Sequence, residues 1–133
     1  MIPEMQYHHI GIACESIDAT AEHYIQLGYA KHDTIIDPLQ NITICFLTHV
    51  SMPCIELLAP VDKDSPVVQI IAKNGTTPYH ICYTVPDLKD AIRQLKRQRY
   101  VLVSSPKPAC ALDDKEVAFL YHKDVGLIEL LQN

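Results

Sequence analysis

Ile55-Glu56-Leu57-Leu58 returns later in the chain as Ile128-Glu129-Leu130-Leu131, and this repeated stretch indicates that the sequence contains one module twice. Working outward from the repeat, each module opens with a histidine inside an apolar run, His9 in the first and His80 in the second. The two histidines are 71 residues apart and the two glutamates are 73 apart, so the copies differ by only two inserted residues. A duplicated module with one His and one Glu in matching places predicts a symmetric site with four potential metal ligands.

Each module follows the order strand, helix and three strands. In the first module, about residues 7–58, Ser16 is expected to cap a helix that Gly28 ends. In the second, about residues 78–131, Asp87 is expected to cap the corresponding helix. Apolar runs predict strands at residues 8–13, 31–36, 42–47 and 53–58, and again at residues 79–85, 100–104, 116–121 and 127–131.

Residues 59–77 lie between the modules and predict a helical linker. Asp64 or Ser65 is expected to cap this helix, Pro66 suits its first position, and residues 67–73 provide about two turns. A linker of this length joins two halves rather than two domains. The whole 133-residue chain is therefore expected to form a single domain.

The alternation of strand side chains predicts where the histidines point. The residues that share a face with them are small: Gly11 and Ala13 beside His9, and Cys82 and Thr84 beside His80. The positions between are bulky and apolar. We therefore expect an α+β fold in which two βαβββ modules form a curved, cup-like eight-stranded mixed sheet, with helices on its outer face and room for a ligand inside.

The two glutamates lie among bulky apolar neighbours, where a carboxylate is costly to bury unless something pairs with it. Taken singly, a strand His is usually a core or edge group, and a strand Glu usually faces water. The matched repetition favours a different interpretation, in which His9, Glu56, His80 and Glu129 hold one divalent cation.

The other histidines do not fit this pattern. His8 competes with its neighbour as a ligand, but it lies on the opposite face of the strand and Tyr79 takes its place in the second module. The remaining ones are expected at the surface without a counterpart in the other module: His23, His32, His49 and His122.

The composition restricts the class of protein. Apolar residues make up 48% of the chain, charged residues 20%, and the net charge is -5, which predicts a folded soluble domain without a basic nucleic-acid surface. The basic face at residues 89–99 is expected to be only a solvated helix surface. We expect no signal peptide and no membrane span. Five cysteines without a C-x-x-C pair predict reduced thiols and a cytoplasmic location.

These residues resemble the vicinal-oxygen-chelate superfamily, which includes glyoxalase I, extradiol dioxygenases, bleomycin-resistance proteins and methylmalonyl-CoA epimerase. The resemblance covers nearly the whole chain and is strongest to the epimerase branch. It rests on residues 9–13 (HIGIA), 55–60 (IELLAP), 64–66 (DSP), 79–82 (YHIC), 115–120 (KEVAFL) and 128–130 (IEL). The family ligands that it implies are His9, Glu56, His80 and Glu129, and it also implies a homodimer.

The chain departs from the family pattern in two places. The first-module catalytic Glu of the family aligns with Leu39, and Asp37 or Gln40 is left as a nearby candidate to replace it. The His-Pro-Lys that usually precedes the last turn reads Tyr121-His122-Lys123, and the following Gly-Gly is reduced to Gly126. An epimerase needs a proton donor and a proton acceptor on opposite faces of the substrate carbon, so the first departure bears directly on the mechanism.

Two imidazoles and two carboxylates leave a six-coordinate divalent ion roughly neutral with two open positions, and Co, Ni, Zn, Mn or Fe all suit this ligand set. Such an ion activates a carbonyl and stabilises the enolate formed when an adjacent proton leaves. We expect Glu129 to be the catalytic base, with Glu56 as its symmetric counterpart.

The predicted function is therefore metal-dependent proton transfer alpha to a carbonyl in a small acyl thioester, as in methylmalonyl-CoA epimerase. One alternative is a glyoxalase I-like lactoylglutathione lyase acting on 2-oxoaldehyde–thiol adducts. A second is a non-catalytic module that binds a drug or metabolite. A thioester held on a carrier protein is a further possible substrate, because the altered last turn bears on what the site accepts.

Overall fold

The computed structural model describes residues 1–133, with nine β-strands, three α-helices and one short 3-10 helix. The chain divides into two compact units. The His9 unit comprises His9–Tyr79, and the His80 unit comprises Met1–His8 with His80–Asn133. None of the three helices combines the length and the apolar character that crossing a bilayer requires. The α+β class and the order of elements in both modules are as predicted.

The His9 unit begins with the part of β1 (Gln6–Ala13) from His9 onward. The elements that follow are α1 Ile17–Gln26, β2 Ala30–Lys31, β3 Ile35–Asp37, β4 Ile42–Thr48, β5 Ile55–Pro60 and α2 Val68–Asn74. The strand order is β2-β4-β5-β1, and β3 also pairs with β4. Because β1 is parallel to β5 whereas β4 is antiparallel to it, this sheet is mixed, as expected.

The His80 unit repeats this plan. It contains β6 (Thr77–Val85) from His80 onward. The elements that follow are α3 Leu88–Arg97, β7 Val101–Ala109, the 3-10 turn Cys110–Leu112, β8 Lys115–His122 and β9 Gly126–Gln132. The strand order is β6-β9-β8-β7. As in the first module, the opening strand β6 is parallel to the closing strand β9, and β8 is antiparallel to β9.

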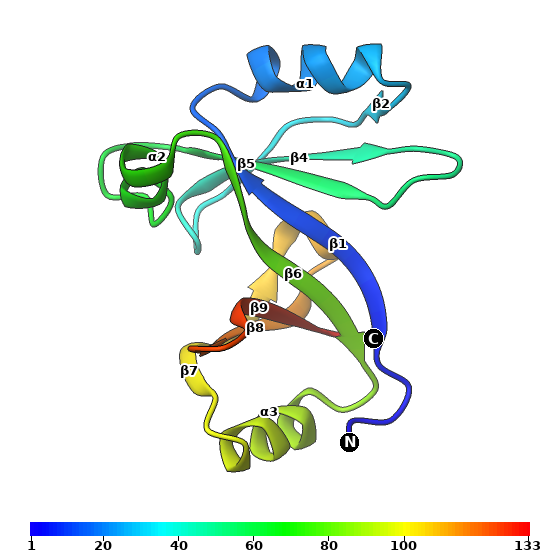
Figure 1. Cartoon of the computed structure of the whole chain (residues 1–133), viewed down its shortest axis with the longest axis vertical. Coiled ribbons are helices and arrows are strands. Elements are labelled where there is room, and N and C mark those ends of the chain that lie inside the picture. Colours follow the sequence, from blue (N-terminus) through cyan, green and yellow to red (C-terminus); the bar gives the residue numbers. More distant parts are fainter. The chain divides into compact units, whose positions relative to one another are not determined.

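Local sequence signals begin the two long helices as predicted. The Ser16 side chain accepts the backbone N–H of Ala19 at 3.2 Å, and the Asp87 side chain accepts that of Asp90 at 3.0 Å. These bonds satisfy amide groups that have no partner inside the helix. Each helix then packs on the sheet of its own unit, α1 on β4 and β5, and α3 on β7, β8 and β9 (Figure 1).

The helix-covered face of each sheet holds the apolar core. In the His9 unit Ile12 and Leu57 pack into the α1 cluster, and in the His80 unit Val85 and Leu130 pack into the α3 cluster. These positions alternate along their strands with the histidines and glutamates. Successive strand side chains point to opposite faces, so His9, Glu56, His80 and Glu129 all lie on the face of their own sheet away from the helix.

The predicted strand at residues 31–36 is in fact two short strands, which is why nine strands are present where eight were predicted. Both pair with β4, with Lys31 opposite Leu47 and Ile35 opposite Ile44. The register therefore shifts by one residue between them. Such an extra residue is a β-bulge, which bends the strand and interrupts its ladder.

The linker helix is confirmed as α2, but its start differs from the prediction. The helix begins at Val68, and the Ser65 hydroxyl is buried without a hydrogen-bond partner instead of capping it. The Val68 N–H bonds to the Ser65 carbonyl at 3.2 Å, so a tight turn precedes the helix. Gly75 follows the helix with a φ of 70°, a conformation in which glycine carries no steric penalty.

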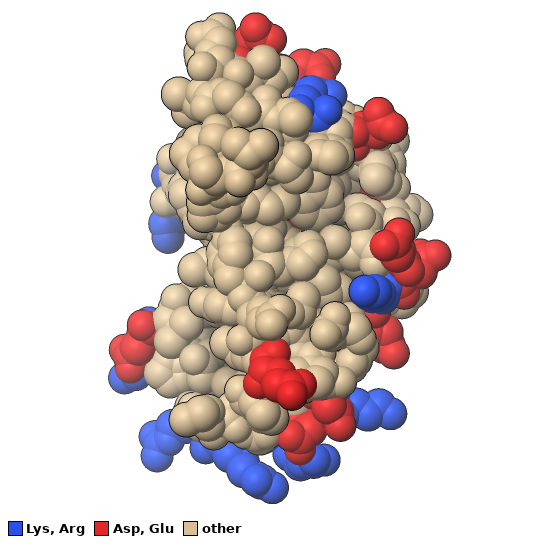
Figure 2. Space-filling view, turned by 90° about the vertical axis from the view of Figure 1, so that its right-hand side faces the viewer, with Lys and Arg blue, Asp and Glu red and all other residues tan.

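The basic residues of α3 lie on its solvent-exposed side, as predicted. Leu88, Ala91, Ile92 and Leu95 are buried, whereas Lys89, Arg93, Lys96 and Arg97 are exposed. Figure 2 shows Lys and Arg gathered with acidic side chains at the end of the molecule where α3 lies. Arg93 forms an ion pair with Asp90 one turn earlier. This mixture of charges is typical of a solvated amphipathic helix rather than a nucleic-acid surface.

Candidate metal centre

In the His9 unit, the predicted ligands of the first module lie together. His9 is on β1 and Glu56 is on the neighbouring parallel strand β5, where its Cα partner is Gly11. The His9 Nε2 atom lies 3.3 Å from the Glu56 Oε1 atom. His9 is 0% exposed and Glu56 is 3% exposed, so a carboxylate that needs a partner is buried against an imidazole.

The His80 unit reproduces this arrangement. His80 is on β6 and Glu129 is on the parallel strand β9, opposite Cys82, which again lies two residues beyond the histidine. The His80 Nε2 atom is 3.2 Å from the Glu129 Oε1 atom, and both residues are 3% exposed. The duplication seen in the sequence is therefore a duplication of geometry, with the same strand register and the same burial in both units.

A phenylalanine that the sequence pattern did not predict as part of the site lies against each pair. Phe46 is the Cα partner of Glu56 on β4, and Phe119 is the Cα partner of Glu129 on β8. The Phe46 and His9 rings meet edge to face at 5.3 Å, and the Phe119 and His80 rings do so at 5.4 Å. These are the only two phenylalanines in the chain and they are 73 residues apart, so the spacing of the glutamates would have revealed them.

The two side chains of each pair are as far apart as adjacent ligands of one ion. For metal–ligand bonds of about 2.1 Å, neighbouring ligand atoms are about 3.0 Å apart on an octahedral ion and about 3.4 Å on a tetrahedral one. The observed distances of 3.3 and 3.2 Å lie between these values. Imidazole nitrogen and carboxylate oxygen are donors that suit divalent first-row metals. The residues of each pair therefore fit a divalent cation.

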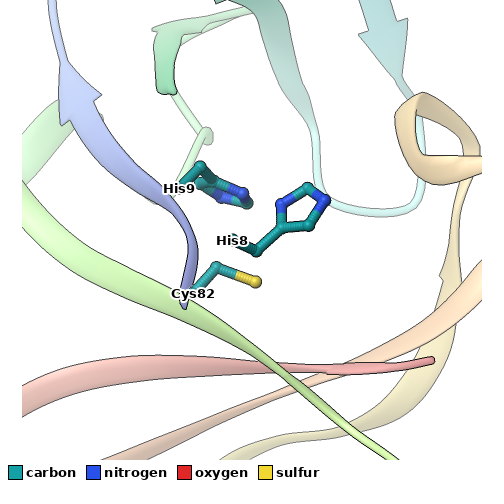
Figure 3. A group of neighbouring side chains, drawn as sticks. All are labelled: His8, His9 and Cys82. Atoms are coloured by element: carbon teal, nitrogen blue, oxygen red, sulfur yellow. The ribbon is translucent and has the colours of Figure 1, made fainter. Parts of the chain in front are cut away.

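Thiols lie near both pairs, but they are not part of the duplicated set. In the His9 unit, burial raises the pKa of the Cys54 thiol, and the nearby His9 imidazole offsets this only in part. In the His80 unit, one ring nitrogen of His8 and the Cys82 sulfur lie within 4.8 Å of each other. Figure 3 shows these two side chains, with His9 of the same strand as His8. The equivalent of Cys82 in the other unit is Gly11, so the thiol is not repeated.

The turn before β4 contains Leu39 and one buried carboxylate, that of Asp37. Leu39 is 59% exposed, and its backbone N–H bonds to Asp37 Oδ1 at 3.0 Å. The Asp37 carboxylate also accepts the Gln40 backbone N–H at 3.2 Å and the Gln40 side-chain amide at 2.9 Å. Asp37 is 1% exposed and satisfied by its own turn, so it stabilises the chain reversal before β4.

The expectation that His49 and His122 lack counterparts is wrong, because they are 73 residues apart and occupy equivalent sites. The His49 ring lies 5.2 Å from the Tyr29 ring, and the His122 ring lies 4.9 Å from the Tyr100 ring. In each case Nδ1 accepts the backbone N–H two residues later, at 3.0 and 3.1 Å. Both are half-buried groups of the strand ends, whereas the expectation of exposure holds for His23 and His32.

The chain belongs to the Glyoxalase/Bleomycin resistance protein/Dioxygenase superfamily, whose family model matches residues 8–119. This confirms the resemblance on which the fold and the enzyme class were predicted. The match spans both modules and contains three of the four predicted ligands, with Glu129 beyond its end.

Within the superfamily, the chain is similar to methylmalonyl-CoA epimerases. It is 33% identical to the ethylmalonyl-CoA/methylmalonyl-CoA epimerase of Cereibacter sphaeroides, over 94% of this chain and 96% of that protein. It is 29% identical to the human mitochondrial methylmalonyl-CoA epimerase, over 94% of this chain and 72% of that protein. The predicted class, an enzyme of the epimerase type, is thereby confirmed.

Solved structures agree with these relatives. The methylmalonyl-CoA epimerase of Mycobacterium tuberculosis superposes with a TM-score of 0.84 at 28% identity, covering 96% of this chain and 87% of that one. A methylmalonyl-CoA epimerase in complex with methylmalonyl-CoA and NH4+ superposes with a TM-score of 0.81 at 26% identity, covering 97% and 94%. The fold is therefore shared with enzymes of this activity along almost its whole length.

Proposed function

We propose that this protein is a divalent-metal-dependent epimerase of an acyl thioester of the methylmalonyl-CoA kind, which moves a proton on the carbon alpha to a carbonyl. The observation that carries the proposal is the duplicated buried His–Glu pair, with Nε2–Oε1 distances of 3.3 and 3.2 Å and a phenylalanine against each histidine. The relatives named above supply the substrate class.

We propose further that His9, Glu56, His80 and Glu129 hold one ion together. A single pair offers only two protein ligands, whereas protein sites for such metals use three or four. Four ligands from two equivalent pairs leave two positions of a six-coordinate ion for the substrate.

The bound ion would supply Lewis-acid stabilisation of the negative charge that develops on the substrate carbonyl oxygen. The protein supplies the proton transfer. We assign Glu129, partly displaced from the ion, as the base that takes up the proton alpha to the carbonyl. Glu56 is its symmetric counterpart: it enters the reaction protonated and gives its own proton to the other face of the same carbon. Exchange of both groups with solvent between turnovers restores the starting protonation.

This assignment gives the second proton-transfer role to Glu56 rather than to a residue near the family position. Leu39 has no titratable group, and the Asp37 carboxylate is held by three hydrogen bonds of its own turn. A duplicated pair provides the two carboxylates that a two-base reaction requires.

Metal stoichiometry tests the shared site. Elemental analysis of natively purified protein should give one divalent ion per chain, and the ion should be cobalt, nickel, zinc, manganese or iron. His9→Ala and His80→Ala should each remove the whole ion, because each deletes one of four ligands from a single site. If either variant keeps half of the metal, the two pairs bind separately and the shared site is rejected.

Proton exchange tests the reaction. Wild-type protein should incorporate deuterium from deuterated water into methylmalonyl-CoA and leave a glutathione–methylglyoxal adduct unconsumed. Glu129→Gln should lower the exchange rate by a factor of about 10²–10⁴, the usual contribution of a general base. Glu116→Gln is the matched control, since Glu116 is an exposed carboxylate on β8 of the same unit. Normal exchange by Glu129→Gln with its metal retained would eliminate Glu129 as the base.

We also propose that the two units form one domain and that the protein is a cytoplasmic homodimer. The dimer is supported by the family resemblance, and the location by an odd number of cysteines without a C-x-x-C pair. Light scattering at several protein concentrations tests the dimer, and fractionation of the source cells tests the location.

A further inference from the structure

The two units agree at the proposed ligands but differ immediately beside them. In the His80 unit, Val101 on β7 lies opposite Tyr121 on β8. In the His9 unit, Ala30 lies opposite Thr48 at the equivalent place. The difference extends along the strand, because Val103 in one unit corresponds to His32 in the other, whose Nε2 atom lies 2.8 Å from the Thr48 hydroxyl. One unit is therefore polar at this place and the other is apolar.

The apolar residues lie on the same face of the sheet as the His80–Glu129 pair. Val117, Phe119 and Tyr121 alternate along β8, and the Phe119 ring contacts the His80 ring. Val101 shares the face of its Cα partner Tyr121. Val103 is the extra residue of a β-bulge, since the register shifts between its two neighbours, and this places it beside the residue opposite Phe119.

These three residues are exposed although they are apolar or aromatic. Val101 is 62% exposed, Val103 is 60% exposed and Tyr121 is 46% exposed. They lie where the sheet of the His80 unit ends, because β7 is the last strand in its order (Figure 1). Three neighbouring exposed apolar groups offer a hydrophobic contact surface that the polar residues of the other unit do not. We call Val101, Val103 and Tyr121 the Tyr121 platform.

The platform is within reach of a substrate held at the proposed metal site. Strands are about 4.8 Å apart and rise about 3.3 Å per residue, which puts the Tyr121 Cα about 8 Å from that of Glu129 and the Val101 Cα about 12 Å from it. If the reacting carbon of a substrate lies beside Glu129, the part of the substrate that follows a few bonds later therefore reaches the platform.

We propose that the Tyr121 platform binds the arm of the thioester substrate, the chain of methylene and amide groups that follows the sulfur. This inference rests on the proposed function. A malonyl-type thioester has two unlike ends, a free carboxylate and a long, largely uncharged arm. The apolar platform beside the His80–Glu129 pair suits the uncharged arm rather than the carboxylate, whereas the polar His32–Thr48 pair at the equivalent place in the His9 unit does not. β7 adds main-chain donors and acceptors at its outer edge for the amides of the arm.

Substitution of the platform separates this role from catalysis. Tyr121→Ser should raise the KM for methylmalonyl-CoA about tenfold, equivalent to about 1.4 kcal/mol, and leave kcat within about twofold. Val101→Ser should have a smaller effect in the same direction. The matched control is Val50→Ser, because Val50 is a fully exposed valine of the β4–β5 turn. Metal content should be unchanged in all three variants.

Two further measurements make the test independent of the proposed reaction. Calorimetric binding of coenzyme A itself should weaken about tenfold in Tyr121→Ser, whether or not the wild-type protein exchanges the proton. Light scattering should show the same oligomeric state for wild type and variant. The platform is rejected if coenzyme A binds wild type and variant equally or binds neither. It is also rejected if the substitution dissociates an oligomer while the KM stays unchanged, because the surface would then be an interface between copies of this chain.

Discussion

Gly28 and Arg99 allow a direct test of whether the residue after the helix contributes to the free energy of unfolding in the same way in both modules. They are equivalent residues, 71 apart, that follow the C-termini of α1 and α3. Gly28 has a φ of 98° and Arg99 a φ of 71°, and each donates its N–H to a carbonyl of the last helical turn. The residue after each also bonds back to that turn, which completes the same helix-ending motif in both units.

The two substitutions that exchange these residue types should act in opposite directions. Gly28→Ala places a Cβ only 2.9 Å from His49 Nε2, and the His49 ring is held by Tyr29 and Ser51. For alanine, the left-handed backbone costs about 1–2 kcal/mol and the clash about another 1 kcal/mol. The free energy of unfolding should therefore fall by about 2–3 kcal/mol. Arg99→Gly removes a similar backbone strain but adds about 0.5–1 kcal/mol of chain entropy, for a net gain of about 0.5–1 kcal/mol.

Thermal unfolding followed by circular dichroism measures both effects. For a chain of this length about 1 kcal/mol corresponds to about 3–5 °C in Tm, so Gly28→Ala should lose about 6–15 °C and Arg99→Gly should gain about 2–5 °C. Arg99→Ala is the control, because it removes the same exposed side chain but keeps the strained backbone. If Arg99→Gly is no more stable than Arg99→Ala, the left-handed residue does not carry the proposed strain.

Three further outcomes are expected. Chelation of the ion should lower Tm, since an ion present at a hundredfold excess over its Kd stabilises the folded state by about 2.7 kcal/mol; an unchanged Tm in a metal-depleted sample would contradict this. Phe46→Leu and Phe119→Leu should each weaken metal binding about tenfold by loosening a histidine ring, and titration showing an effect in only one unit would argue against equivalent roles. Burial raises the pKa of the Cys14 and Cys45 thiols above their ordinary value of 9.0. Above this pH the unfolded chain loses these two protons, whereas the folded state still holds them. The free energy of unfolding should therefore fall as the pH rises above 9.0, and the fall should diminish in a Cys14→Ala, Cys45→Ala variant examined by urea denaturation.

The sequence predicted the elements and the pairing of residues within each module because those features have local or repeated signals. Helix caps at Ser16 and Asp87 depend on one side chain and the next turn, so they were predicted correctly. The His–Glu pairs were predicted because the same residue types recur at nearly constant spacing. Side-chain alternation then placed them on the face opposite the helix, and the burial of both pairs agrees with it.

Other features depend on tertiary contacts that a single pattern does not encode. The bulge between β2 and β3 follows from pairing with β4, so an apolar run at residues 31–36 was read as one strand. Ser65 has a typical capping side chain, but the turn before α2 uses its carbonyl instead. The Phe46 and Phe119 contacts were missed for a different reason. Phenylalanine is normally a core residue, so its repetition was not recognised as part of a site.

The two modules agree at the proposed metal ligands and differ beside them. Register, burial and ring contact are reproduced at both His–Glu pairs, with Nε2–Oε1 distances that differ by only 0.1 Å. Two residues beyond Phe46 and Phe119, on the same face of the sheet, the modules differ: the first has the Thr48 hydroxyl and the second has the Tyr121 ring. Equivalent ligand pairs give no basis for telling two ends of a substrate apart, whereas a substrate with unlike ends needs a difference between the modules. The place where the repetition breaks down is therefore where the specificity for the substrate is expected to lie.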